Sequence, residues 1–426
     1  MKRMLKCGLA VMALPLLLAG CMSTTKEIKA TVDFKTVTTY NEIQEQMDKS
    51  ILLNSNRSGY DVFKNIYAEK PDENLLFSPL SLTCALSMLE NGAVGQTDQE
   101  ILEVLHLTDK TNMNVTYNGV INHFNSLTER NKEYDMPETI LNMSNSFWFR
   151  NQGLKIKSEY INLIKSYFDG EVQAVDFTDE KTKDVMNLWI EEKTNHLLKD
   201  TIKKTNPSDV AYLINTLYFK GQWTDEFPEH RTIKQDFSLT DGTMIPVDMM
   251  HLDEGKSYFE NNDCQIVALN YSDATMYVIL PKDDLDSFFK ETDYDTLNDM
   301  IGQMEYGKVN IHFPKFKYNN STKLNDNLID LGMPSSFDPF NADFSNMIEE
   351  SNNNVFVSLV FQNTAIAVDE KGTEAAAVTV IAMNESAMEE PEKQYDFICD
   401  KPFMYIIREN NTQSDLFIGM VKDPTQ

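Results

Sequence analysis

The spacing of hydrophobic residues predicts helices early in the chain and strands later. Apolar residues recur every three or four positions, as on one face of a helix. Four such stretches are residues 78–92, 97–105, 159–168 and 181–196. Ser78 is placed to cap the first helix, because Pro79 follows at the first helical position. Thr97 and Glu100 have the spacing of a capping box, so we expect the second helix to begin there.

Strand patterns dominate from the middle of the chain onward. Residues 210–219 are almost continuously apolar, which is typical of a central strand covered on both faces. Further strands are predicted at residues 264–270, 275–280, 307–316, 355–368, 402–407 and 416–421. Helices first and strands later favour an α+β fold over alternating units. The length of 426 residues alone would allow two or three domains, yet no linker divides residues 43–426, so a single domain is expected there.

Residues 370–390 do not resemble an ordinary connection. Connecting loops are usually short and rich in Gly, Pro, Asn and Asp, whereas this stretch is long and rich in Ala, Thr and Val. It follows a strand-like alternation, and Gly372 offers a backbone pivot without a β-carbon. As a strand, it would alternate between a face formed by Thr373, Ala375, Ala377 and Thr379 and a face formed by Glu374, Ala376 and Val378. We expect an exposed segment that can become a strand.

Charge and composition exclude some partners. The formal net charge of −28 argues against nucleic-acid binding, which depends on clustered Lys and Arg. Solubility is the ordinary role of such acidity. With 42% hydrophobic residues, the chain can bury a substantial core.

The N-terminus has the features of a processing signal. A basic start with Lys2, Arg3 and Lys6 precedes an apolar stretch, residues 8–18, that is short for a membrane span. The ending at residues 18–21 (LAGC) resembles the lipobox of bacterial lipoproteins, which implies cleavage before Cys21 and acylation of that residue. We expect residues 1–20 to be a signal peptide and residues 21–42 to be a tether. An ordinary secretory signal with a chance cysteine is the alternative.

The sequence contains no pattern typical of a catalytic or metal site. None of the six histidines lies in a recognisable motif, and the signatures of serine hydrolases, zinc proteases and phosphate-binding loops are missing. Cys84, Cys264 and Cys399 lie in apolar surroundings without C-x-x-C spacing, so we expect buried free thiols. The prediction is a protein that is not an enzyme and needs no cofactor or metal.

Several motifs between residues 60 and 424 resemble the serpin family. They are, in the order of the family, residues 74–81 (NLLFSPLS), 85–89 (ALSML), 215–223 (NTLYFKGQW), 314–316 (PKF), 397–405 (FICDKPFMY) and 416–421 (LFIGMV). The resemblance covers nearly the whole predicted body. It implies helices packed around three β-sheets, with a large central sheet and an exposed reactive-centre loop.

The resemblance also implies a mechanism. A target protease attacks the loop as a substrate and forms an acyl-enzyme through its own serine or cysteine. The cut loop then inserts between two strands of the central sheet and carries the protease to the opposite pole. In this family Glu370 stands at the top of the sheet and the hinge runs from Gly372 to Thr379. The hinge carries no bulky or charged residue on its inward face, which favours an inhibitor over a non-inhibitory member.

The family also assigns residues around the opening of the sheet. Ser78, Ser81 and Asn215 match its polar cluster, and Gln362 stands where many serpins have histidine. Glutamine can donate and accept, so its pH response should differ from that of a histidine. Lys315 and Glu370 are expected to form a surface ion pair that adds little stability. Trp223 is either a gating residue or an ordinary core aromatic.

The family spacing places the scissile bond at Ser386-Ala387, with bonds beside Met383, Glu385 or Met388 as alternatives. No Lys or Arg occurs from Gly372 to Pro391. Trypsin-like enzymes are therefore poor targets, and elastase-like, subtilisin-like or some cysteine proteases are favoured.

Together these features predict a monomeric bacterial lipoprotein of the outer membrane, facing the periplasm or the cell surface. Its expected function is protease inhibition by suicide trapping. A non-inhibitory serpin that acts as a binding protein is the alternative, and a hydrolytic surface lipoprotein lacks the residues that it would need.

Overall fold

The computed structural model describes residues 26–37, 39–349, 355–373 and 393–426. In these ranges the helices are α1 (Tyr40–Gln46), α2 (Lys49–Glu69), α3 (Pro79–Glu90), α4 (Gly95–Val104), α5 (Met113–Glu133), α6 (Ser158–Phe168), α7 (Thr182–Lys193), α8 (Leu285–Glu291), α9 (Tyr294–Gly302) and α10 (Asn325–Asp330). Two short 3-10 helices are η1 (Glu229–Arg231) and η2 (Ser335–Phe337).

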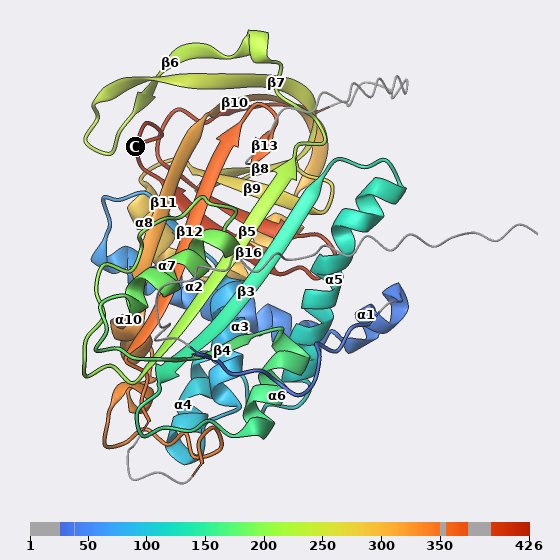
Figure 1. Ribbon diagram of the computed structural model, residues 1–426. Coiled ribbons are helices and arrows are strands. Elements are labelled where there is room, and N and C mark those ends of the chain that lie inside the picture. The colour runs from blue at the N-terminus through green and yellow to red at the C-terminus, as the bar shows by residue number, and fades with distance from the viewer. Residues whose placement is uncertain (1–25, 38, 350–354, 374–392) are drawn as a thin grey trace, which may run out of the picture.

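A seven-stranded main sheet runs through the molecule (Figure 1). Its strands, in spatial order, are β1 (Lys26–Glu27), β4 (Glu171–Val175), β3 (Thr139–Arg150), β5 (Ala211–Gln222), β13 (Gly372–Thr373), β12 (Leu359–Asp369) and β11 (Phe316–Lys323). The strand predicted at 210–219 is β5, and its neighbours on both sides confirm its central place.

The second sheet has nine strands. Their order is β14 (Gln394–Ile398), β10 (Glu305–Pro314), β7 (Met244–Glu260), β8 (Cys264–Asn270), β9 (Ala274–Pro281), β15 (Phe403–Glu409), β16 (Asp415–Val421) and β2 (Leu75–Phe77), with β6 (Ile233–Ser238) beside β7. The long strand β7 pairs with β6, β10 and β8 along successive parts of its length. It thereby joins the two smaller sheets expected from the resemblance into one hydrogen-bonded sheet.

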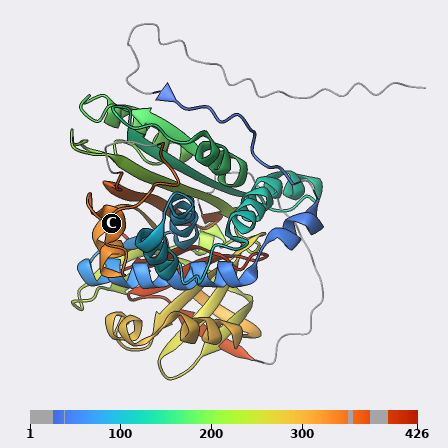
Figure 2. The ribbon, with the colours of Figure 1, turned by 90° about the horizontal axis from the view of Figure 1, so that it is seen from below.

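The main sheet is covered on both faces because its central strands are apolar on both sides. Leu213 and Phe147 belong to the large core that includes α3, whereas Trp148, Tyr212 and Ile214 form a second cluster with Trp189 and Ile190 of α7. Helix α3 has every residue buried, and the Ser78 side chain accepts a hydrogen bond from Ser81 N, as expected of a cap. Figure 2 shows the helices around the sheets from below.

Two expectations about local structure were wrong. The helix predicted to start at the Thr97 capping box begins at Gly95, and Thr97 Oγ1 instead accepts a hydrogen bond from Asp343 N at 3.0 Å. The Glu100 carboxylate binds Ser335 N and Oγ at 2.8 and 2.7 Å. Both side chains of the box therefore form hydrogen bonds with distant segments instead of capping the helix. Likewise the strand predicted at 307–316 ends at Pro314, and β11 in the main sheet begins at Phe316.

The segment predicted as a tether is bound to the body over its described residues. Glu27 pairs with Gln173 at the edge of the main sheet, and Lys35 N donates to Ser166 O at 2.9 Å. Residues 1–25, including the predicted signal and Cys21, lie outside the described residues. Among the residues that the structure describes, no helix is both long and apolar enough to span a bilayer.

Candidate functional site

The site is the boundary between strands β5 and β12 of the main sheet. Upper and lower refer here to the view of Figure 1, in which β5 and β12 run from bottom to top. In the lower part these two strands pair directly and in parallel, with Asn215 opposite Gln362. Higher up they are separated by β13, which pairs antiparallel with both. Gly372 faces Gln222 on one side and Asp369 on the other. The first two residues of the predicted hinge therefore already occupy a strand position between β5 and β12.

Gly372 is required by its surroundings. A β-carbon on this residue would lie 2.1 Å from the carbonyl oxygen of Gly221, and its φ of 152° is one that other residues rarely adopt. The backbone on either side is also held. Phe227 N donates to Glu370 O and Trp223 N donates to Lys371 O, both at 2.9 Å.

Thr373 is buried, and its hydroxyl lies 2.6 Å from the hydroxyl of Tyr271. Tyr271 stacks on Trp223 with ring centroids 4.2 Å apart, and burial raises the pKa of its phenol well above the ordinary value. Trp223 Nε1 donates to Asp369 O at 2.9 Å. Trp223 is thus a core aromatic that also holds the start of the hinge. Tyr271 was missed in the sequence, although it directly follows the predicted strand 264–270.

Glu370 accepts hydrogen bonds from Lys315 Nζ at 2.7 Å and from Thr232 Oγ1 at 2.8 Å. Burial alone would raise the pKa of Glu370, but these hydrogen bonds outweigh it and hold the pKa below its usual value. The expected pair is present, yet the description as a surface pair was wrong, because Glu370 is only 9% exposed. A buried carboxylate depends on its partners more than an exposed one does.

A cluster of neutral polar side chains lies where β5 and β12 pair directly. Gln362 Oε1 accepts from Ser78 N at 2.8 Å, and Gln362 Nε2 donates to Ser78 O at 2.9 Å and to Asn215 Oδ1 at 3.3 Å. Ser81 Oγ donates to the same Asn215 oxygen at 3.1 Å. The structure brings together all four residues predicted for this cluster. Gln362 uses both ends of its amide to join the cap of α3 to the two strands.

The remaining predicted loop residues lie outside the described part of the chain. These are the hinge residues Glu374, Ala375, Ala376, Ala377, Val378 and Thr379 and the candidate cleavage residues Met383, Glu385, Ser386, Ala387 and Met388.

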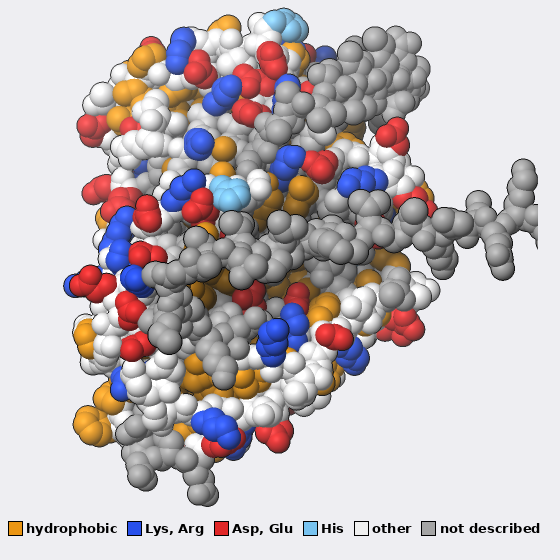
Figure 3. Space-filling view, in the orientation of Figure 1, with side chains coloured by type: hydrophobic (Ala, Val, Ile, Leu, Met, Phe, Trp, Pro, Cys, Tyr) orange, Lys and Arg blue, Asp and Glu red, His pale blue; other side chains and the backbone are white. Residues whose placement is uncertain are grey.

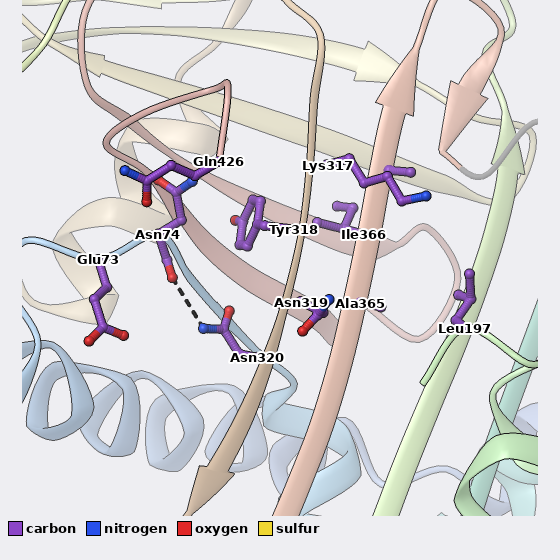
Figure 4. A pocket seen from close by; sticks show the side chains of 11 residues that line it. Glu73, Asn74, Leu197, Lys317, Tyr318, Asn319, Asn320, Ala365, Ile366 and Gln426 are labelled. Atoms are coloured by element: carbon purple, nitrogen blue, oxygen red, sulfur yellow. Dashed lines mark hydrogen bonds between the residues drawn. The ribbon is translucent and has the colours of Figure 1, made fainter. Parts of the chain in front are cut away.

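A pocket of about 570 Å³ lies beside strand β12 (Figure 4). Ala365 and Ala367 of β12 line it together with Lys317 of β11 and Leu197, which follows α7. Both alanines are partly buried, and Ala365 also packs against the second core cluster. On the face seen in Figure 3, acidic and basic side chains of the described residues are interspersed.

Other candidate chemistry is not assembled within the described residues. They contain no group of three or more His, Cys, Asp or Glu side chains that could hold a metal. Cys84, Cys264 and Cys399 are free and buried, as predicted.

The family model for serpins, described as serine protease inhibitors, matches residues 53–424. This chain belongs to the serpin family. A serpin-like protein of Methanosarcina mazei is 31% identical over 427 residues, covering 96% of each chain. Leukocyte elastase inhibitor of Xenopus laevis is 30% identical and covers 86% of this chain and 97% of its own.

Solved serpin structures agree with the fold. The native state of the thermophilic serpin tengpin has a TM-score of 0.80 at 27% identity, covering 92% of this chain and 97% of its own. Thyroxine-binding globulin in complex with thyroxine has a TM-score of 0.77 at 27% identity, covering 89% and 100%. The α+β serpin fold predicted from sequence is confirmed. Similar serpins thus include both an elastase inhibitor and a thyroxine-binding globulin.

We expect Gln362→Glu to make stability depend on pH. One carboxylate oxygen can still accept from Ser78 N, but the other faces two acceptors, Ser78 O and Asn215 Oδ1. Only the protonated acid can donate there, so the pKa of the introduced carboxyl group should rise in the folded state. The loss of stability relative to wild type should be small below the unfolded pKa of about 4.3 and grow to about 2 kcal/mol as pH rises. Urea unfolding between pH 4 and 8 measures it.

Gln362→Met is the matched control for this position, because methionine has a similar size and no charge. Its free energy of unfolding should be lower than that of wild type by the same amount at each pH. Equal pH profiles for the two variants would contradict the assigned contacts.

We expect Lys315→Ala to lower the free energy of unfolding by about 1.5 kcal/mol at pH 7, since it leaves a buried carboxylate with one partner fewer. The folded pKa of Glu370 is depressed below 4.5, so this contribution is present above that pH and is lost as the carboxylate is protonated. Urea midpoints of wild type and variant should therefore converge in acid. Lys317→Ala, which changes an exposed lysine two residues along, should have no such effect.

Proposed function

We propose that this serpin is a lipid-anchored bacterial inhibitor of serine proteases, with cysteine proteases as a second target class, and that it acts by suicide trapping. Cleavage of the reactive-centre loop would be followed by an acyl-enzyme and by insertion of the loop between β5 and β12. The chain itself would act as a substrate that is not released, not as an enzyme, and would need no cofactor.

The position of β13 carries this proposal. Gly372 and Thr373 lie between β5 and β12, antiparallel to both, with Thr373 buried. If the residues after Thr373 were inserted as well, they would continue this register between β5 and β12 toward the lower end of the sheet. About fifteen residues that each gain roughly 0.5 to 1.5 kcal/mol from ladder bonds would supply a driving force on the order of 10 kcal/mol.

The proposed target is elastase-like or subtilisin-like, with cleavage at Ser386-Ala387. The support is the lack of Lys and Arg from Gly372 to Pro391 and the similarity to an elastase inhibitor. Trypsin-like proteases require a cation that this stretch does not offer.

The proposed location is the outer membrane, on its periplasmic or cell-surface side, through acylated Cys21. More than one acyl chain gives stable anchoring, whereas one alone is marginal. The signal in residues 1–21 supports this proposal. The protein is proposed to act as a monomer.

A binding protein is the second candidate function, because thyroxine-binding globulin shares this fold at a similar TM-score. The two functions differ in what loop cleavage does to stability. An inhibitor should melt at a markedly higher temperature after its loop is cut, since the loop adds a strand. A serpin whose loop stays outside the sheet should melt at an unchanged temperature.

Incubation with an elastase-like protease should give a covalent complex that survives SDS, together with a C-terminal fragment that begins at Ala387. Gel electrophoresis and mass spectrometry of the fragment test both points. Quantitative recovery of active protease without a complex would contradict inhibition, and a fragment beginning elsewhere in residues 383–389 would move the scissile bond.

Thr373→Arg should convert the protein from an inhibitor to a substrate. The Thr373 side chain is buried against Tyr271, so a guanidinium there would have to be desolvated without a partner. The loop should then be cut without forming a complex. Glu374→Arg is the matched control, because residue 374 is predicted to point to the opposite face and should still permit trapping. Equal trapping by both variants would contradict the alternation.

A further inference from the structure

The described N-terminal segment, residues 26–37, begins at the lower end of the main sheet. Lys26 pairs with Ala174 on β4, and Ala174 and Ala211 both lie opposite Phe149 of β3. Lys26 is therefore level with Ala211, the first residue of β5. Gly372 faces Gln222, the last residue of the same strand. Eleven residue steps along β5 separate the two levels (222 − 211 = 11), or about 36 Å.

The register of β13 predicts where a trapped protease would arrive. Thr373 faces Gly221 and runs antiparallel to β5, so each further inserted residue would move one position toward Ala211. Met383 would reach Ala211 (383 − 373 = 221 − 211 = 10), and Ser386 would lie just beyond the end of the strand. The inserted strand would stand four strand spacings from β1, or about 19 Å. The trapped protease and Lys26, where the described chain begins, would thus lie at the same pole.

Only a short length of chain connects this pole to the proposed lipid. Cys21 and Lys26 are five residues apart (26 − 21 = 5), so they span at most about 18 Å. A protease domain of about 230 residues has a radius of gyration of about 17 Å and is roughly 45 Å across. Such a domain does not fit between this pole and a membrane held so close.

We propose that this lower pole faces the lipid surface, with Gly372 and Thr373 at the opposite end of the sheet, and that segment 26–37 is a strap that must detach to make room for the trapped protease. The inference rests on the proposed function. With the strap released, nineteen residue steps separate Cys21 from Tyr40 at the start of α1 (40 − 21 = 19), and the chain reaches about 65 Å.

The strap is held in a way that permits release. Its contacts are a two-residue strand on β4, backbone bonds such as Ile28 N to Val172 O at 3.2 Å, and asparagine side chains of α5 and α6. Ile28, Ala30, Phe34 and Val37 pack against the core only partly, and no residue from 28 to 37 is fully buried. In Figure 2 the blue N-terminal segment runs along the outside of the molecule toward α1.

A reversible lock on the strap tests the proposal. Glu27 and Gln173 are directly paired across β1 and β4, so their α-carbons are about 4.5 to 5.5 Å apart, within the range of a disulfide. The variant is Glu27→Cys with Gln173→Cys, and Gln173→Cys alone is the control. Burial raises the pKa of Cys84, Cys264 and Cys399, so these thiols should not compete in the oxidation.

The lipidated variant is placed on phosphatidylcholine–phosphatidylglycerol vesicles and compared with the same variant expressed from Met22, which keeps every described residue. The measurement is the number of serpin molecules consumed per elastase-like protease molecule inactivated. We expect this number to rise several-fold for the oxidised, anchored protein and to return to the wild-type number on reduction. The oxidised form without lipid should behave as wild type.

Two outcomes would overturn the inference. Equal consumption by the oxidised anchored and the oxidised unanchored protein would show that the membrane does not obstruct the protease. Loss of trapping by the oxidised unanchored protein would show that the disulfide between β1 and β4 blocks insertion into the sheet itself, without any obstruction by a membrane. Failure of the unanchored wild-type protein to trap any protease would instead contradict the proposed inhibition itself.

Discussion

The contact between β5 and β12 is the constraint on which the rest of this structure depends. Central strands normally pair along their whole length, because unpaired backbone groups are costly. Here direct pairing is confined to Leu359–Asn363 and Tyr212–Thr216, and β13 separates the strands above. Where β13 lies between them, the single parallel ladder of β5 and β12 is replaced by two antiparallel ladders, one on each side of β13. The boundary can therefore remain closed below while its upper end is already shaped to receive a strand.

The two ends of this boundary are held by different chemistry. At the upper end, the buried Glu370 carboxylate depends on Lys315 and Thr232, so the contact is electrostatic and sensitive to acid. At the lower end, Gln362 joins Ser78 and Asn215 through an amide that does not titrate. Acid should therefore weaken the upper contact, through protonation of Glu370, and leave the hydrogen bonds of Gln362 unchanged.

The N-terminal segment connects the sheet to the proposed anchor. Because β1 extends the main sheet at β4, Lys26, the first described residue, lies level with the end of β5 opposite the hinge. The direction in which β13 enters the sheet points to the same end. Strands β1 and β13 therefore mark opposite ends of the same sheet, although they are far apart in the sequence.

Local patterns were sufficient where a segment's own residues decide its structure. The apolar run of β5, the Ser78 cap of α3 and the buried side chain of Thr373 could be predicted because burial and capping act over a few residues. Matching the serpin motifs extended this to the fold and to the polar cluster. Only the tertiary structure decided contacts between distant segments. Thr97 and Glu100 form hydrogen bonds with Asp343 and Ser335 instead of a capping box. The hydroxyl of Tyr271 contacts that of Thr373. Residues 26–37 bind to β4, α5 and α6. Such contacts depend on which surfaces the whole chain brings together, and no local spacing encodes them.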